Sequence, residues 1–274
     1  MDALRQVDEW PVDKAAVGVT RADTEAGYTG DKHATFAWAS VTKLVTALAT
    51  LVAAEEGVVD LDETAGPPGS TVRHLLSHAS GLAPDGEVPI AQPGTRRIYS
   101  NAGFEVLATV VGERAEMPFP DYLRAAVFEP LGLSASLDGS PAWGVSGTLS
   151  DLLALGRELL EPKLIAPETL AEATAVAFPG LVGVLPGFGR MDPNDWGLGF
   201  ELRDEKRPHW TGERNSPRTF GHFGQSASFL WIDPEARLAC ACLADRGFDD
   251  WAKEAWPRLS DAVLADLGAT SAGV

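Results

Sequence analysis

The stretch FAWASVTKLVTALATL, residues 36–51, contains a helical pattern and a pair of potentially reactive side chains. From Ser40 onward apolar residues recur at helical spacing, and Gly57 is expected to end the helix. At i,i+3 spacing, Ser40 and Lys43 lie on one helix face. A serine becomes a good nucleophile when a base takes its proton, and a lysine of lowered pKa can be that base. A helix cap followed by a solvated lysine fits the same residues, so the motif alone leaves both interpretations open.

A second motif, RIYSNAGF at residues 97–104, places Tyr99 and Asn101 just before a predicted helix. A tyrosine close to Lys43 could share its proton and act as a general acid or base. Asn101 could donate a hydrogen bond to a substrate carbonyl or hold Lys43. An ordinary turn with a half-buried tyrosine is the alternative for this motif taken alone.

A third motif, TFGHFGQSASF at residues 219–229, enters a predicted strand through His222 and Gly224. A glycine at such a position lets a ligand approach the backbone closely. The backbone N–H of Gln225 could pair with that of Ser40 to bind a developing oxyanion.

The remaining segments predict strands at both ends of the chain and helices between them. We expect a strand at 15–20, a hairpin at 228–245, a Gly- and Pro-rich loop at 179–199, a short helix ending in a loop within 72–82, and helices at 100–115, 119–132, 148–161 and 251–267. This order predicts one α/β (α+β) domain over residues 1–274. Its sheet lobe would take about 1–60 and 190–274, and its helical lobe about 61–189, with the site in the cleft between them.

Composition and charge exclude several classes of protein. The 274 residues are 45% hydrophobic and 22% charged, as in soluble globular proteins. The net charge of −17 argues against a surface for nucleic acid. The apolar run at 44–54 is shorter than the ~20 residues of a membrane span. The first ten residues lack the basic start and apolar core of a secretory signal, so we expect a cytoplasmic protein with no membrane partner.

The cysteines and histidines do not predict a metal site. Cys240 and Cys242 alternate in a predicted strand, so we expect both to be buried on one face without a disulfide. His74 and His78 have i,i+4 spacing, but Leu75 stands where a zinc-binding helix carries its glutamate. A structural role in the SHASGL turn is expected for His78. The two histidines without visible partners are expected at the surface: His33 and His209.

In their order along the chain, S-V-T-K (40–43), Y-S-N (99–101) and H-F-G (222–224) resemble the elements of a known family. They are similar to S-x-x-K, Y-x-N and K-T-G or H-x-G of the class C β-lactamase and penicillin-binding-protein-like serine hydrolases. That family includes D-alanyl-D-alanine carboxypeptidases, D-aminopeptidases and carboxylesterases. The resemblance spans about residues 12–267, and three flanking segments extend it: VRHLLSHASGL (72–82), PGTRRIYSNAGFEVLA (93–108) and GHFGQSASFLWIDPEARLACACLADR (221–246).

This resemblance implies a β-lactamase/transpeptidase-like fold and acyl transfer to water through an acyl-enzyme. By it, Ser40 is the acylated nucleophile, Lys43 its activating partner, and Tyr99 a proton relay. It implies that Asn101 positions the substrate and that His222 takes the place of the family lysine.

The resemblance also implies that the N–H groups of Ser40 and Gln225, beside Gly224, form the oxyanion hole. The expected partner is a small-molecule ester, amide or β-lactam (D-amino-acid compounds included), and no cofactor or metal is expected.

Two residues depart from the family pattern. His222 replaces lysine, so a fixed positive charge for a substrate carboxylate is lost near neutral pH. Phe223 replaces a small hydroxylated residue and removes a polar contact. Both departures argue against penicillins and D-Ala-D-Ala peptides and favour esters or amides. Tyr99 at the start of the second motif favours the class C-like branch over class A.

Two alternatives differ in class. GQSAS (224–228) resembles the G-x-S-x-G elbow of an α/β-hydrolase, but the last glycine is missing and no histidine follows His222, as that fold requires. The other alternative is a non-catalytic or slowly deacylating penicillin-recognising protein. A non-catalytic module predicts loss of Ser40, Lys43 or Tyr99, and all three are present.

Overall fold

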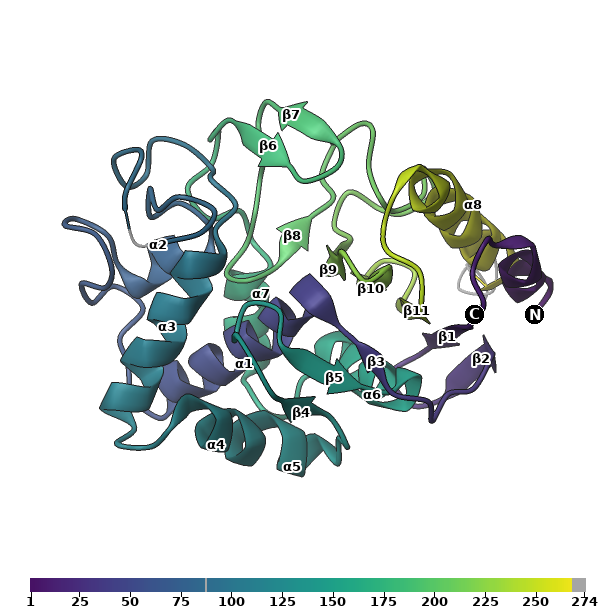
Figure 1. Ribbon diagram of the computed structural model, residues 1–274, viewed down its shortest axis with the longest axis horizontal. Coiled ribbons are helices and arrows are strands. Elements are labelled where there is room, and N and C mark those ends of the chain that lie inside the picture. The colour runs from purple at the N-terminus through teal and green to yellow at the C-terminus, as the bar shows by residue number, and fades with distance from the viewer. Residues whose placement is uncertain (87, 268–274) are drawn as a thin grey trace.

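The main sheet is built from both ends of the sequence in the computed structural model, which describes residues 1–86 and 88–267 (Figure 1). Its strand order over those residues is β2-β1-β11-β10-β9-β8, and all neighbours are antiparallel. The predicted strand and hairpin are confirmed. The strands are β1 (Ala15–Thr20), β2 (Glu25–Thr29), β8 (Glu201–Leu202), β9 (Phe220–Gly224), β10 (Ser228–Asp233) and β11 (Leu238–Ala244).

One face of the sheet is covered by α8 (Asp250–Leu267) and by an N-terminal 3₁₀ helix, Asp2–Glu9, which lie side by side (Figure 1). Trp256 of α8 packs against Phe229 of β10, with ring centroids 5.1 Å apart. Cys240 and Cys242 of β11 are buried in the same layer as free thiols, as predicted.

The opposite face packs against α6 (Leu149–Leu160), which lies across β1, β10 and β11. Thr148 and Asp151 form a reciprocal capping box at its start. A Cβ added at Gly156 would lie 2.9 Å from the Ala239 side chain, so glycine permits the close approach of helix and strand. The segment 61–189 expected for the helical lobe therefore also contributes a helix that covers the sheet.

The helical lobe surrounds α1 (Thr42–Glu55), whose residues from Thr42 to Ala53 are all buried. The segment 72–82 is a short helix that ends in a loop, as expected: the chain leaves the helix before His78, whose φ of +56° is left-handed. The helix expected at 119–132 contains a π-helical turn at 124–128. The other helices are α2 (Val72–Leu76), α3 (Asn101–Arg114), α4 (Phe119–Leu123), α5 (Glu129–Leu131) and α7 (Pro167–Ala173).

Two small sheets complete the described chain. One has the order β3-β5-β4, from β3 (Phe36–Ala37), β5 (Val145–Gly147) and β4 (Ser136–Leu137). The other is a hairpin of β6 (Gly183–Leu185) and β7 (Gly189–Met191), inside the segment 179–199 that we expected to be a loop. Three-residue strands are too short to show an alternating pattern, which explains that error. No helix in the described part of the chain is long and apolar enough to cross a membrane.

Candidate active site

Ser40 lies in a 3₁₀ turn, Ala39–Val41, directly before α1 rather than within the helix itself. Ala39 has φ of +44°, a left-handed conformation that costs a non-glycine residue on the order of 1–3 kcal/mol. The backbone N–H of Trp38 donates to the Val145 carbonyl of β5 at 2.9 Å. The sharp bend is therefore held by the small sheet before it and by α1 after it.

Lys43, one turn into α1, is fully buried and surrounded by acceptors. Its Nζ lies 2.8 Å from Asn101 Oδ1, 2.9 Å from the Ala142 carbonyl oxygen and 3.4 Å from Ser40 Oγ. Burial lowers the pKa of Lys43 to about 7, although Asp85 and Glu105 act in the opposite direction. Near neutral pH a substantial fraction of this side chain is therefore an uncharged amine within reach of the serine.

Tyr99 lines the same cleft as Ser40. Its ring centroid is 4.7 Å from Lys43 Nζ and 4.6 Å from the ring of His78. His78 is fixed in turn, because its Nδ1 accepts from the Ser100 backbone N–H at 3.1 Å. Burial raises the pKa of the Tyr99 phenol above its usual value, so the hydroxyl remains protonated at neutral pH.

Asn101 is the first residue of α3 and is oriented through both ends of its amide. Its oxygen faces Lys43, and its Nδ2 donates to Asp85 Oδ1 at 3.0 Å. Ser100 caps the helix by accepting from the Gly103 N–H at 3.0 Å. Of the two possibilities left open by the sequence, the structure shows the one in which Asn101 holds Lys43.

His222 lies on β9, opposite Leu230 of β10. Its Nδ1 is 2.6 Å from the Phe223 carbonyl oxygen, which only accepts, so Nδ1 carries the hydrogen and Nε2 is an acceptor in the neutral ring. Burial and the nearby Lys43 lower the pKa of His222 to about 3. The ring is uncharged at neutral pH, and the fixed charge that a lysine would supply is absent at this position.

The turn after β9 lies against the residues that precede the serine. Ser228 Oγ donates to the Trp38 carbonyl at 2.6 Å. A Cβ added at Gly224 would lie 2.6 Å from that carbonyl oxygen and 2.9 Å from the Ser40 nitrogen, so glycine is required for this approach. Gln225 follows Gly224 directly and lines the same cleft as Ser40.

These side chains meet in a cleft of about 110 Å³. Every residue predicted for the site lines it, except Lys43 and Gly224. A larger hollow of about 620 Å³ beside α3 and α4 contains none of the predicted site residues. The residues that line the cleft are Ser40, Tyr99, Asn101, Leu185, Pro186, Trp196, His222, Phe223 and Gln225.

The sequence did not single out several residues that complete the site. Leu185, Pro186 and Trp196 come from the Gly- and Pro-rich segment 179–199, which was expected to be a loop but in which the sequence singled out no individual residue. Asp85 and the Ala142 carbonyl have no sequence signal, since one is a single acid in a turn and the other a backbone group.

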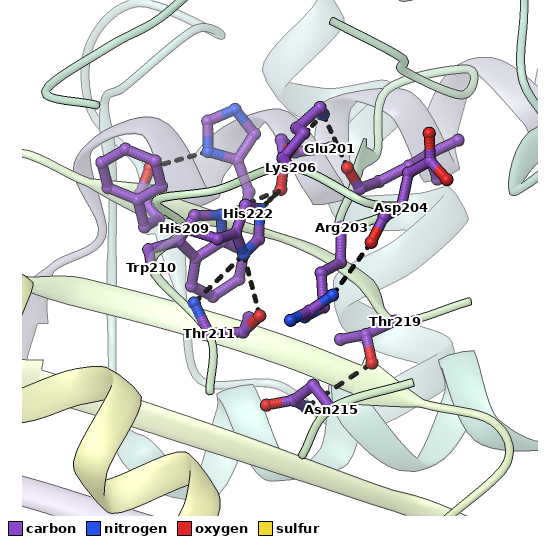
Figure 2. Close-up of polar contacts among 12 residues, drawn as sticks. Glu201, Arg203, Asp204, Lys206, His209, Trp210, Thr211, Asn215, Thr219 and His222 are labelled. Carbon is purple, nitrogen blue, oxygen red and sulfur yellow. Dashed lines mark hydrogen bonds and ion pairs between the residues drawn. The ribbon is translucent and has the colours of Figure 1, made fainter. Parts of the chain in front are cut away.

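His209 is a correction to the sequence analysis, which placed it at the surface. It is buried, and its Nε2 lies 2.9 Å from Glu201 Oε2 (Figure 2). His209 itself lies in an irregular segment without periodicity, which left its burial undetected. His33 is exposed, as expected.

The model of the Beta-lactamase family matches residues 6–137 and 134–264, which together span most of the chain. The chain belongs to the beta-lactamase family. It is a serine hydrolase of that family, and its fold is the β-lactamase/transpeptidase-like α/β fold that the three motifs predicted.

Relatives of this beta-lactamase-family chain differ in how much of it they share. Penicillin-binding protein 4* of Bacillus subtilis (strain 168) is 27% identical over 36% of this chain and 29% of its own length, so the chain spans under a third of that curated relative. The crystal structure of a beta-lactamase (Mb2281c) from Mycobacterium bovis is 53% identical, with a TM-score of 0.96 over 97% of this chain and 99% of that one. EstCE1, a hydrolase with promiscuous acyltransferase activity, shares the fold at 19% identity, with a TM-score of 0.77 and 96% of each chain covered.

Proposed function

We propose that this chain hydrolyses small, uncharged carboxylic esters through an acyl-enzyme on Ser40. The observation that carries the proposal is the uncharged state of His222 in a cleft otherwise lined by apolar and neutral polar groups. None of the described lining residues is a lysine or arginine. A substrate carboxylate would enter this cleft without a paired cation, which is costly, whereas a neutral ester would not.

Acylation follows from the contacts of Ser40. Uncharged Lys43 takes the hydroxyl proton as Ser40 Oγ attacks the ester carbonyl. The N–H groups of Ser40 and Gln225 donate to the oxygen on which negative charge develops. As the tetrahedral intermediate collapses, Tyr99 protonates the leaving alkoxide and is reprotonated by Lys43, so the alcohol leaves and the acyl group stays on Ser40.

Deacylation repeats these steps with water. Tyr99 and Lys43 take a proton from the attacking water, the ester bond to Ser40 breaks, and the serine oxygen recovers that proton. The free carboxylic acid then leaves a cleft that offers no fixed cation, which favours its release. The raised pKa of Tyr99 makes it a relay of protons rather than a standing phenolate base.

The volume of the cleft limits the size of the acyl group that can bind. About 110 Å³ is well below the 300 Å³ or more of pockets that enclose drug-sized ligands. Leu185, Pro186 and Trp196 give it an apolar wall, so a short aliphatic acyl chain is the group that fits. Amides of the same shape form the second substrate class, with a poorer leaving group.

A parallel panel tests the proposal: a short-chain p-nitrophenyl ester, nitrocefin and a D-amino-acid anilide, each with wild-type protein and Ser40→Ala. The ester should be turned over in a Ser40-dependent way, and nitrocefin poorly. Efficient nitrocefin turnover would refute this ranking. A fluorophosphonate adduct on Ser40 without turnover of any of the three would instead support a slowly deacylating penicillin-recognising protein.

A further inference from the structure

A buried ion pair joins Glu201 of β8 and Lys206 (Figure 2). Lys206 lies near Trp196, which is part of the apolar wall of the cleft. The side chains of Glu201 and Lys206 are 1% and 2% exposed, and Lys206 Nζ lies 2.5 Å from Glu201 Oε1. The other carboxylate oxygen accepts from His209 Nε2 and from Trp210 Nε1, each at 2.9 Å. Burial alone would raise the pKa of Glu201, but His209 and Lys206 lower it to about 2, so the carboxylate is charged.

The ammonium of Lys206 connects two ends of one loop. Besides Glu201, it donates to the carbonyl oxygens of Asp195 and Leu202, each at 2.6 Å. These residues begin and end the segment 195–202, which also closes on itself through a bridge between Trp196 and Glu201. All three ammonium hydrogens therefore hold this segment.

A second buried cation, Arg97, binds Asn194, the residue directly before the segment 195–202. Arg97 Nε donates to the Asn194 carbonyl at 3.0 Å, and its other nitrogens bind the carbonyls of Ser77 and Ala177 at 2.6 and 2.7 Å. The backbone on both sides of Trp196 is thus bound by cations that contact main-chain oxygens.

Trp196, whose backbone is held in this way, packs against the rings of active-site residues. Its ring centroid lies 5.4 Å from the ring of His222, 5.9 Å from that of Tyr99 and 4.7 Å from that of His78. Lys206 Nζ lies 5.9 Å from the Trp196 ring centroid. Trp196 lines the cleft and Lys206 does not, so Lys206 can affect substrate binding only through the position of Trp196.

A buried ion pair is a poor source of stability, because desolvating two charges costs several kcal/mol per ion and apolar replacements are often as stable. The ammonium of such a pair can instead fix geometry, because its three N–H groups hold three acceptor atoms in fixed positions relative to one another. The contacts of Lys206 are concentrated on the loop that carries the cleft wall.

We propose that Lys206, charged and paired with Glu201, is a positioning residue that fixes Trp196 as the size limit for the acyl group. Trp196 is the specificity-determining residue, and Lys206 acts through it. The inference rests on the proposed acyl-enzyme chemistry at Ser40. It predicts that loosening the loop admits longer acyl chains.

The test compares kcat/KM for p-nitrophenyl acetate and hexanoate. Trp196→Ala should raise the hexanoate-to-acetate ratio about tenfold or more, the range that a few methylenes in a pocket command. The double variant Lys206→Met/Glu201→Gln, which removes both charges together, should raise the ratio about threefold or more. Because Lys206 acts through Trp196, the double variant should change the ratio less than about twofold in the Trp196→Ala background.

Arg203→Met is the matched control. Arg203 is also a buried cation of this region, but it binds the carbonyl of Asp204 (Figure 2) and that of Gly212 instead of the segment 195–202. It should lower the melting temperature and leave the ratio unchanged. Lys206→Arg is a second, charge-retaining variant, and it should also raise the ratio because a planar guanidinium cannot reproduce the three ammonium contacts.

The inference can be separated from the proposed function by a probe that needs no turnover. Phosphonylation of Ser40 by ethyl and hexyl fluorophosphonates, followed by intact mass, reports the same size limit even when no ester is hydrolysed. A folded double variant or Lys206→Arg whose ratios match the wild type for both esters and phosphonates would overturn the role of Lys206. Wild-type protein inert to esters but size-selective toward the phosphonates would refute the proposed function alone.

Discussion

The Asn101 side-chain oxygen lies 2.8 Å from Lys43 Nζ, closer than the 3.4 Å between Nζ and Ser40 Oγ. Asn101 Oδ1 and the Ala142 carbonyl can only accept hydrogen bonds. When Lys43 is uncharged, its two N–H groups remain directed at those acceptors, and its lone pair is left for the Ser40 hydroxyl. Asn101 therefore orients the amine as a base, in addition to any contact with substrate.

Activity toward a neutral ester should rise with pH through about 7. The uncharged amine of Lys43 is the form that accepts the serine proton, and its pKa is lowered to about 7, so the active fraction grows as pH increases. His222 does not contribute to the pH dependence in this range because its pKa is about 3. The measurement is kcat/KM from pH 5 to 9, and a flat profile would contradict the assignment of Lys43 as the base.

Asn101→Asp should move the rise of kcat/KM with pH to higher pH. A carboxylate 2.8 Å from Nζ stabilises the ammonium and raises the pKa of Lys43, on the order of one unit or more. Activity at pH 7 should fall about fivefold or more and recover in alkaline buffer. Asn101→Ala is the control, since it removes the acceptor without adding charge and should lower kcat with no upward shift of that rise.

Tyr99→Phe should reduce kcat by about 10²–10⁴-fold, the usual contribution of a positioned acid–base group. The ring contacts with His78 and Trp196 do not need the hydroxyl, so the fold should be retained. Steady-state kinetics and circular dichroism measure the two effects. Hydrolysis at the wild-type rate by a folded variant would remove Tyr99 from the proton relay.

Much of the site was accessible from the sequence because its residues sit in contiguous motifs with fixed spacing. Ser40 and Lys43 are one helical turn apart, and Tyr99 and Asn101 flank a helix cap, so local geometry largely determines their relationship. The order of the three motifs then predicted which segments meet. The sheet strands with long apolar runs, such as 238–244, were visible for the same reason.

The parts that escaped prediction depend on contacts without local pattern. Ala142 contributes only a backbone carbonyl, and Asp85 reaches Asn101 from a turn. Lys206 and His209 read as surface residues by type, but a buried Glu201 carboxylate holds them inside. Burial of a polar side chain is decided by the partners that surround it in the folded chain, and sequence periodicity carries no information on them.

Gly224→Ala should abolish activity and lower stability by about 1–3 kcal/mol, the usual cost of overpacking a tight site. The new methyl would meet the Trp38 carbonyl at 2.6 Å and the Ser40 nitrogen at 2.9 Å, which pushes β9 away from the nucleophile. Gly247→Ala is the control in the same region, because its Cβ would meet the nearest atom at an ordinary 3.5 Å. Urea unfolding and ester turnover of both variants test the difference, and equal effects would contradict it.

The free energy of unfolding should fall as the pH is lowered from 6.5, in part because His222 is buried uncharged. Its folded-state pKa of about 3 lies below the ordinary value of 6.5, so between these values the unfolded chain binds a proton that the folded chain does not. Stability from this group is complete above pH 6.5 and is lost toward acid at up to about 1.4 kcal/mol per pH unit. His222→Gln cannot titrate, so its unfolding free energy, measured in urea between pH 7.5 and 5, should decline less steeply than that of the wild type. Parallel pH dependences of the two proteins would show that His222 is not buried in its neutral form.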